Sequence, residues 1–228
     1  MGKQSKNSLY FRVNKKGLHV NAFLTFLKAV VKPFYFLLKP FRYYGSKKVK
    51  DGACIYVGNH YTLFDCLYVV CTTKEGVHLV AKKEVFDNPF LGFLARRVKA
   101  ISVSRDGKDV RPLLNCFKCL NNDEKICIYP EGTRNKSGKG LLPFKHGAAL
   151  MAIRCKKPIQ LVVMYEKPKF FRCAHILVGE PFELTEYYDR KLLDEEVLEA
   201  DNKIRQKMLD LIEEHKVFLE NKKKKKVN

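Results

Sequence analysis

Short apolar runs alternate with segments of helical periodicity from residue 54 to residue 178. The runs typical of buried strands are 54–58, 77–81, 101–104, 126–129, 159–165 and 173–178. Helical patterns fall between and after them, at 63–71, 88–98, 110–120, 147–155 and 192–219. Strands that alternate with helices pack as a sheet with helices on its faces. The sequence therefore predicts an α/β fold with a largely parallel central sheet flanked by helices.

Polar side chains follow three of the predicted strands, at the end where an open α/β sheet places its sites. The first strand is followed by Asn59 and His60 with Asp65, the third by Arg105, and the fourth by Glu131, Gly132, Thr133 and Arg134. Lys145 precedes the next helix. We expect these residues to gather at one edge of the sheet.

His60 and Asp65 could act as a base and its partner. A neutral imidazole accepts a proton near pH 7, and a carboxylate on its other ring nitrogen fixes its tautomer. On a regular helix, residues five positions apart point about 140° away from each other. The pair therefore requires His60 in the strand-to-helix turn and Asp65 in the first helical turn. The alternative is a capping or structural pair.

The stretch 130–140 is too polar for a core. Backbone N–H groups around Gly132, together with Arg134, could form an anion-binding cradle. Lys145 and Gly147, at the start of a predicted helix, could form a second one. The alternative is a solvated loop with ordinary surface charges.

The net charge of +20 is concentrated at the two ends of the chain. Residues 1–50 hold ten Lys and two Arg without a single acid, and the run Lys222–Lys226 adds five more cations. Basic ends suit an anionic surface, either nucleic acid or membrane headgroups. The chain has no recognised nucleic-acid-binding motif and its middle is nearly neutral, so we expect no nucleic acid partner.

Residues 18–50 combine a helical apolar stripe with an opposing cationic edge. Such a segment is typical of a membrane interface, and Pro33 and Pro40 predict two short helices with a bend. The alternative is a helix that packs on its own domain. We expect residues 1–17 to form a basic, mobile N-terminus and residues 222–228 a Lys-rich tail that is solvated or adds membrane attraction.

The eight cysteines do not resemble a disulfide framework, since the chain is long and no signal peptide precedes them. Cys116 and Cys119 form a lone C-x-x-C without a second pair at zinc-ligand spacing, so no metal site is expected. Cys66 follows Asp65 but has no basic neighbour that would form a thiolate. No stretch of 18 residues is free of charge, so an ordinary membrane-spanning helix is not predicted.

Taken together and in order, the polar blocks resemble those of the glycerolipid acyltransferase family, in particular its bacterial 1-acylglycerol-3-phosphate acyltransferases. The first block is Asn59-His60 with Asp65, and the second is the strand Ala100–Ser104 ending at Arg105. The third is Tyr129-Pro130-Glu131-Gly132-Thr133-Arg134 followed by Phe144–Gly147, and the fourth is Pro158-Ile159. Departures such as Lys99, Ser102, Gln160 and Leu161 remove no catalytic group but put acceptor and acyl preference in doubt.

The resemblance implies transfer of an acyl chain from acyl-CoA or acyl carrier protein to the sn-2 hydroxyl of lysophosphatidic acid, giving phosphatidic acid for phospholipid synthesis. His60 would be the general base and Asp65 its orienting partner. The glycerol phosphate would be held by Arg105, Glu131, Gly132, Thr133, Arg134 and Lys145. No cofactor or metal is implied beyond the acyl donor.

The implied layout is an acyltransferase domain over residues 51–221, held by the basic N-terminal segment on a phospholipid surface. Its expected place is the cytoplasmic face of the cell membrane, as a peripheral or monotopic protein. Within the family, the alternative acceptors are glycerol 3-phosphate or another lysophospholipid. Outside it, the alternative is a basic membrane-surface scaffold without turnover.

Overall fold

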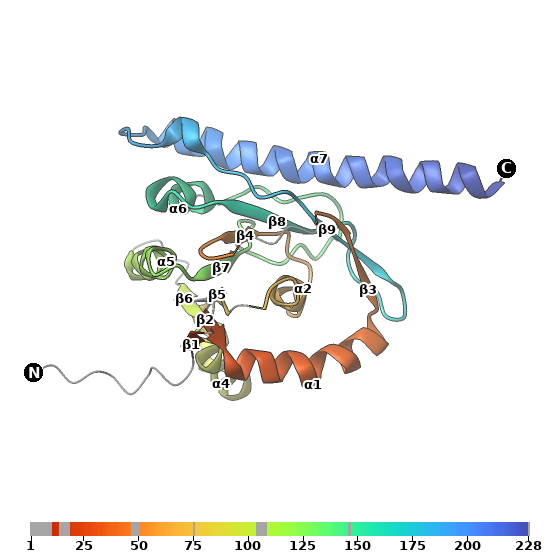
Figure 1. The fold of residues 1–228 in the computed structure, drawn as a ribbon, viewed down its shortest axis with the longest axis horizontal. Coiled ribbons are helices and arrows are strands. Elements are labelled where there is room, and N and C mark those ends of the chain that lie inside the picture. The colour runs from red at the N-terminus through yellow and green to blue at the C-terminus, as the bar shows by residue number, and fades with distance from the viewer. Residues whose placement is uncertain are drawn as a thin grey trace, which may run out of the picture.

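A computed structural model describes residues 11–13, 19–46, 51–74, 76–103, 109–145 and 147–227. Its centre is a sheet of seven strands in the order β3-β9-β8-β4-β7-β5-β6 (Figure 1). The strands are β3 (Phe41–Gly45), β4 (Ile55–Val57), β5 (Val77–Lys82), β6 (Ile101–Val103), β7 (Lys125–Ile128), β8 (Ile159–Met164) and β9 (Ala174–Val178). All six strands predicted from apolar runs are present, and the α/β class is confirmed.

The sheet is mixed, although parallel pairs dominate it. Neighbours from β8 through β4, β7 and β5 to β6 run parallel. Strand β9 is antiparallel to β8, and β3 pairs in parallel with β9. The reversal follows from the short β8–β9 connection, because a parallel return would need a crossover of a dozen or more residues.

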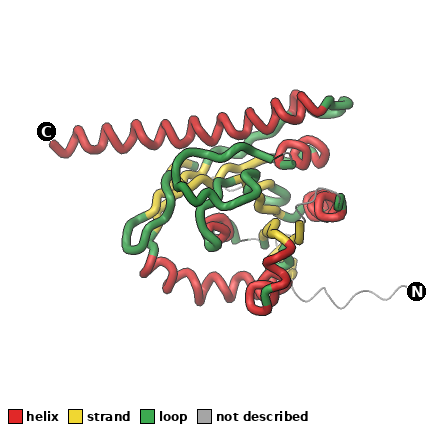
Figure 2. The backbone as a smooth tube through the Cα atoms, turned by 180° about the vertical axis from the view of Figure 1, so that it is seen from behind, coloured by secondary structure: helices red, strands yellow, loops and turns green. Residues whose placement is uncertain are grey.

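Helices cover both faces of the sheet (Figures 1 and 2). They are α1 (Ala22–Leu38), α2 (Asp65–Val70), α3 (Lys83–Asp87), α4 (Pro89–Arg97), α5 (Arg111–Asn121), α6 (Ala148–Cys155) and α7 (Asp194–Val227), with a 3₁₀ turn, η2, at Thr185–Tyr187. Ile55 and Val57 of β4 point into the core shared with α5, α6 and α7. Tyr56 points to the other face, where Tyr68 of α2 joins it. This alternation explains why every residue of β4 is buried.

The helix start predicted at Asn88 is confirmed. Asn88 caps α4 by accepting hydrogen bonds at its side-chain oxygen from the N–H groups of Phe90 (3.1 Å) and Leu91 (2.9 Å). Pro89 stands at the first helical position, where its missing N–H costs no hydrogen bond. Capping residue and proline thus define this boundary locally, without help from tertiary contacts.

The N-terminal segment differs from the two helices that the sequence predicts. It forms one helix, α1, which contains Pro33, and then the strand β3. Phe41 is buried and pairs with Ala174 of β9, so the sheet begins at residue 41 rather than after residue 50. Residues 11–13, within the segment expected to be mobile, pair as β1 (Phe11–Val13) with β2 (His19–Asn21) in an antiparallel ribbon.

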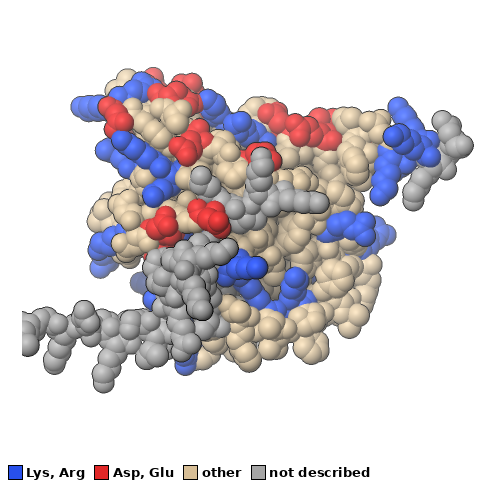
Figure 3. Space-filling model, viewed as in Figure 1, with Lys and Arg blue, Asp and Glu red and all other residues tan. Residues whose placement is uncertain are grey.

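The Lys-rich end of the chain is not a separate tail, since α7 continues through it to Val227. Lysine favours helix, and the run contains no residue that would stop one. Helix α7 covers the face of the sheet opposite α1, and the cations at its end therefore lie far from that helix (Figures 1 and 3). No helix in the described part of the chain has the length and apolar character needed to cross a bilayer.

Candidate active site

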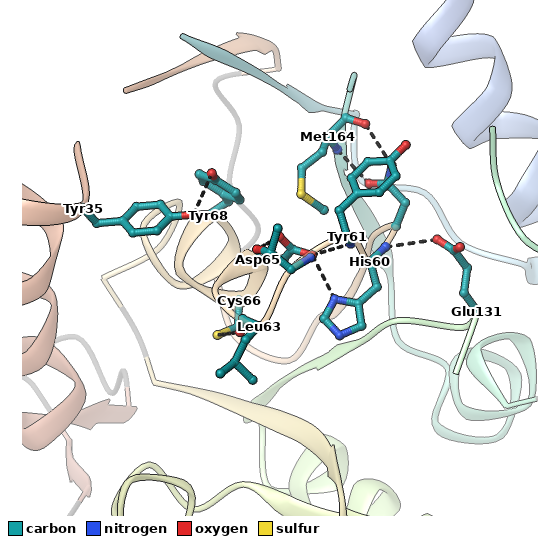
Figure 4. A network of polar contacts seen from close by, with 11 residues as sticks. Tyr35, His60, Tyr61, Leu63, Asp65, Cys66, Tyr68, Glu131 and Met164 are labelled. Carbon is teal, nitrogen blue, oxygen red and sulfur yellow. Dashed lines mark hydrogen bonds and ion pairs between the residues drawn. The ribbon is translucent and has the colours of Figure 1, made fainter. Parts of the chain in front are cut away.

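His60 lies in the turn that follows β4, and Asp65 is the first residue of α2 (Figure 4). The imidazole Nδ1 lies 2.9 Å from Asp65 Oδ2. The turn brings the two side chains together, as the spacing of the residues requires. The predicted pairing of His60 with Asp65 therefore exists in the structure, at the carboxyl end of a central strand.

The buried carboxylate of Asp65 is held by the turn that it closes. Its Oδ2 also accepts hydrogen bonds from the N–H groups of Tyr61 (2.6 Å) and Thr62 (2.7 Å). Its Oδ1 accepts from the Thr62 hydroxyl at 2.6 Å. Because two backbone donors fix the carboxylate, it can hold the imidazole with N–H on Nδ1 and the lone pair on Nε2. The same contacts occupy two N–H groups near the start of α2 that could otherwise have served as oxyanion donors.

The imidazole plane is fixed as well. The His60 ring stacks on the Tyr129 ring, with centroids 4.5 Å apart and planes 13° from parallel. Tyr129 directly follows β7, the neighbour of β4 in the sheet. Within the described chain no hydrogen bond reaches His60 Nε2, and the side chain remains partly exposed. Its second nitrogen is thus available to a substrate hydroxyl.

Glu131 contacts the backbone of His60 rather than its imidazole. Its side chain is buried, and Oε1 accepts from the backbone N–H of His60 at 3.0 Å while Oε2 accepts from that of Leu142 at 3.2 Å (Figure 4). Burial raises the pKa of Glu131, and the two backbone hydrogen bonds oppose that rise. This position differs from the contact with glycerol phosphate that the sequence predicts, because both oxygens already have partners within the protein.

Two asparagines attach the His60 turn to later parts of the chain. The Asn59 side chain donates to the Met164 carbonyl (2.9 Å) and accepts from the Met164 N–H (2.8 Å), which joins the turn to the end of β8. The backbone N–H of Asn135 donates to the His60 carbonyl at 2.6 Å. The turn is therefore bonded on both sides to loops that follow neighbouring strands.

Each predicted anion cradle has some of its backbone donors occupied in the structure. The Gly132 N–H donates to the Tyr129 carbonyl at 3.0 Å, and the Lys145 N–H donates to the Pro130 carbonyl at 2.8 Å. At the start of α6, the Ala149 N–H donates to the buried Asp201 carboxylate at 3.0 Å. These three backbone donors are used within the protein, so an anion would have to be held by the remaining N–H groups of the loop and by side chains.

Three predicted site residues present their side chains to solvent: Thr133, Arg134 and Lys145. Gly132 adopts a left-handed backbone with φ of +61°, and the Lys145 stem crosses it closely enough that a Cβ there would lie 2.8 Å from Lys145 Cδ. The glycine therefore lets the lysine lie across this loop. Arg105 lies outside the described residues.

The cysteines give no sign of a nucleophile beside His60. Burial raises the pKa of the Cys66 thiol to about 12, so it remains protonated at neutral pH. Cys119, but not Cys116, belongs to a cluster with His78 and Glu124 whose potential metal-ligand atoms lie within 4.8 Å of one another. His78 lies near the amino end of β5, away from the carboxyl ends of the strands, where His60 lies. Its Nε2 forms an ion pair with Glu124 Oε2 at 3.1 Å.

Sequence reasoning named the ion pair but missed most of its supports. Tyr129, Asn135 and Thr62 each contact His60 or Asp65, although none was expected to have a role of its own. Tyr129 and Asn135 flank the Glu-Gly-Thr-Arg run, so their closeness to a recognised block was the available signal. Their contacts depend on how the loop folds back over β4, which the sequence pattern does not specify.

A partly exposed histidine whose Nδ1 is bound by a buried carboxylate, at the carboxyl edge of an α/β sheet, has the arrangement that general-base chemistry requires. The protein-family model named "Acyltransferase" matches residues 40–165, which is more than half of the chain. The chain belongs to the acyltransferase family.

Named relatives agree with this assignment. The chain is 34% identical over 122 residues to the 1-acyl-sn-glycerol-3-phosphate acyltransferase of Helicobacter pylori, covering 53% of this chain and 52% of that protein. It is 36% identical over 112 residues to the enzyme of the same name from Haemophilus influenzae, covering 48% and 46%. The chain thus spans about half the length of these curated relatives.

The fold also matches a solved structure. The crystal structure of the 1-acyl-sn-glycerophosphate (LPA) acyltransferase PlsC from Thermotoga maritima superposes with a TM-score of 0.62. The match covers 82% of this chain and 79% of that one, at 22% sequence identity. At this identity the likeness shows the fold.

Proposed function

We propose that the protein transfers an acyl chain from acyl-CoA or acyl carrier protein to the sn-2 hydroxyl of 1-acylglycerol 3-phosphate, giving phosphatidic acid. The observation that carries the proposal is the His60–Asp65 pair, with Nδ1 2.9 Å from Oδ2 and the imidazole partly exposed, in a chain of the acyltransferase family. The names of the relatives from Helicobacter pylori and Haemophilus influenzae support the choice of acceptor.

In the proposed reaction, His60 Nε2 takes the proton of the acceptor hydroxyl as its oxygen attacks the thioester carbonyl. Asp65 stabilises the imidazolium that forms. The tetrahedral intermediate collapses with departure of the thiolate, and the imidazolium returns the proton to that sulfur. The acyl–oxygen bond replaces the acyl–sulfur bond, and no acyl-enzyme forms. The raised pKa of Cys66 agrees with this direct transfer.

The acceptor phosphate is assigned to the exposed cations of the site. Arg134 and Lys145 lie on the loop that bonds to the His60 turn, and their side chains are exposed. Arginine binds phosphate through a planar fork of donors, whereas lysine acts as a point charge. We include Arg105 on the strength of the sequence block alone. Gly132 and Thr133 shape the loop, and Glu131 positions His60 through the hydrogen bond to its backbone N–H.

We place the protein on a phospholipid surface through α1. Phe26, Val30, Phe34 and Leu37 recur along one side of this helix and are all exposed. Its other side faces the body, where the Lys28 ammonium donates to the Thr73 carbonyl at 2.9 Å. The apolar stripe is therefore not used in packing the domain, and interfacial burial would remove it from water. Tyr35 of α1 packs on Phe64, beside Asp65, with ring centroids 5.7 Å apart, so the helix adjoins the site.

The experiment that tests the reaction measures acyl transfer to lysophosphatidic acid in mixed micelles, with acyl-CoA and acyl carrier protein as donors. His60→Ala should lower turnover by at least the roughly 10²–10⁴-fold that general-base catalysis contributes. His175→Gln is the control, because the His175 ring bonds to His215 of α7 and to no site residue. Near-normal turnover in His60→Ala would refute the mechanism.

The remaining acceptors and the non-enzyme alternative are outcomes of the same assay. Product from glycerol 3-phosphate or another lysophospholipid, but none from lysophosphatidic acid, would keep His60 as the base and change the substrate. Vesicle binding without turnover on any acceptor would leave the basic membrane-surface scaffold. The intact His60–Asp65 pair argues against that reading.

A further inference from the structure

The loop between β8 and β9 carries two adjacent, outward-facing phenylalanines. The Phe170 side chain is 63% exposed and that of Phe171 is 75% exposed, the highest value among the large apolar residues of the described chain. Scattered single apolar residues are ordinary on a protein surface, but two neighbouring rings at a loop tip are not. The loop is far in sequence from α1, and no sequence pattern connects the two.

The backbone of this tip is held in an unfavourable conformation. Phe171 has a φ of +57°, a left-handed value that is rare for a bulky residue. Its N–H donates to the Leu38 carbonyl at the end of α1, at 2.8 Å. Strained positions of this kind persist where the surroundings impose them, and they cluster at functional sites. Here the strain keeps both rings in water rather than against the sheet.

The tip adjoins the C-terminal end of α1. Beside the Phe171 contact, the Ala174 N–H donates to the Pro40 carbonyl at 2.8 Å. The Lys39 ammonium lies 4.4 Å from the centroid of the Phe170 ring. Leu37, one of the exposed residues of the α1 stripe, is two positions from Lys39. Figure 1 shows the loop descending to the C-terminal end of α1.

The charges around the tip indicate its partner. Lys167, Lys169 and Arg172 belong to the loop, against a single acid, Glu166. Along the lower edge in Figure 3, where α1 lies, the visible described surface shows no Asp or Glu and has Lys and Arg beside it. Aromatic rings ringed by cations fit an anionic bilayer, in which the rings enter the acyl boundary and the cations meet headgroups. A second copy of the chain would instead bring like charges together.

We propose that Phe170 and Phe171 form a second membrane-inserting element, which acts with α1 to set the depth and tilt of the protein on an anionic bilayer. The inference rests on the membrane part of the proposed function and adds a contact from the β8–β9 loop, which meets the C-terminal end of α1. Insertion of two rings at one end of α1 would hold that end deeper in the bilayer and so set the tilt of the helix axis.

The test uses the absence of tryptophan from the natural chain. A Phe170→Trp variant carries a single tryptophan at the tip, and a Leu193→Trp variant carries one at a comparably exposed site (64%) just before α7. Both are mixed with vesicles of phosphatidylcholine and phosphatidylglycerol, with or without bromine on the acyl chains. We expect a blue shift and strong bromine quenching for Phe170→Trp only. Equal quenching in the two variants, with both fully bound, would overturn the proposal.

A second variant tests the energetic role without the fluorophore. Phe170→Ser with Phe171→Asn removes both rings, and asparagine tolerates the left-handed backbone. Vesicle affinity in flotation should fall about tenfold or more, as expected for two phenylalanines that no longer leave water. Leu193→Ser with Val217→Ser, which removes one exposed apolar residue just before α7 and one within it, should leave the affinity unchanged.

Two readouts separate this proposal from the reaction itself. Acyl transfer in mixed micelles should be equal in the ring-free variant and the wild type, because detergent delivers the acceptor. No transfer by either protein, with reduced vesicle binding in the variant, would contradict the proposed function and leave the insertion proposal standing. Unchanged vesicle binding in the ring-free variant would refute the insertion proposal. The proposal would also fail if the wild type were a dimer, the ring-free variant a monomer, and the two bound vesicles equally well.

Discussion

The Glu131 carboxylate accepts a hydrogen bond from the backbone N–H of His60, with Oε1 3.0 Å from the nitrogen. The other oxygen accepts from Leu142, so a single buried side chain joins the His60 turn to the loop after β7. Two of the sequence blocks thereby become one unit. The acid of the Glu-Gly-Thr-Arg run acts from within the protein, while the arginine of the same run faces outward.

Replacement of Glu131 by Gln should lower kcat and leave KM nearly unchanged. The amide offers one oxygen to two backbone donors, so one of them loses its partner, at a cost of about 1–3 kcal/mol. If that cost falls on the positioning of His60, turnover drops about ten- to a hundredfold. Steady-state kinetics with varied lysophosphatidic acid would show it. A raised KM with unchanged kcat would instead place Glu131 on the substrate.

Arg134→Ala should give the opposite pattern. A charge-assisted contact with phosphate contributes about 1.5–3 kcal/mol, so the KM for the phosphate-bearing acceptor should rise about ten- to a hundredfold. Monoacylglycerol, which lacks the phosphate, is the matched acceptor, and the variant and wild type should use it equally poorly. An equal loss on both acceptors would mean that Arg134 supports the fold rather than the phosphate.

Asp65→Asn should abolish most activity while keeping the turn. An asparagine at this position retains one acceptor for Tyr61 and Thr62 but cannot hold the N–H tautomer at His60 Nδ1 in the same way. Loss of the equivalent carboxylate in the Ser-His-Asp template costs about 10⁴-fold in kcat, and we expect about 10³–10⁴ here. Thr62→Val, which removes only the 2.6 Å bond to Oδ1, should cost about tenfold or less. Similar losses in the two variants would contradict the orienting role of Asp65.

Gly132→Ala should destabilise the protein more than Gly140→Ala does. Both glycines have left-handed backbones, with φ of +61° and +59°, so both substitutions carry a backbone penalty of about 1–2 kcal/mol. A Cβ at Gly132 would also displace the Lys145 stem, whereas nothing lies within 4 Å of one at Gly140. Thermal melts should show Tm falling by about 2–4 °C per kcal/mol. Equal shifts would mean that Lys145 moves aside without resistance.

The His78–Glu124 pair should stabilise the fold at neutral pH and lose that effect in strong base. Burial alone would lower the pKa of His78, but hydrogen bonds to Cys119 and Glu124 raise it to about 10 from 6.5. A histidine with a raised folded pKa contributes its full stabilisation below the unfolded value, and loses it as pH rises through the folded value. Glu124→Gln should therefore cost about 1.5–3 kcal/mol in urea unfolding near pH 6 and far less above pH 10. If the loss of unfolding free energy did not change with pH, His78 would not carry a charge in the folded protein.

Much of the fold could be predicted because its strands are short, apolar and well separated. The turn at His60 could be predicted from Gly58, which ends the preceding strand, and from the angle that a regular helix would place between His60 and Asp65. Strand β3 could not be found this way. Phe41–Gly45 continues the apolar and cationic pattern of α1, and its strand character depends on β9, which lies more than 130 residues later.

In the candidate site, too, contacts between residues close in sequence could be predicted and contacts between distant residues could not. His60 and Asp65 are local in sequence, so their spacing predicts their contact. Glu131 and Gly132 lie in a polar loop whose side chains could face either way, and only the fold shows that the acid turns inward and that the Gly132 N–H is used. Polar composition distinguishes a loop from a core, but it does not show which polar groups already have partners.

The bonds between Asn59 and Met164 join residues 105 positions apart. Strand β4 is the first central strand to leave the ribosome, yet both of its neighbours in the sheet, β7 and β8, are made later. A nascent chain that has not reached residue 164 therefore carries His60 and Asp65 without the clamp that holds their turn. The turn that holds His60 and Asp65 is therefore completed only when a segment made about 100 residues later has joined the sheet.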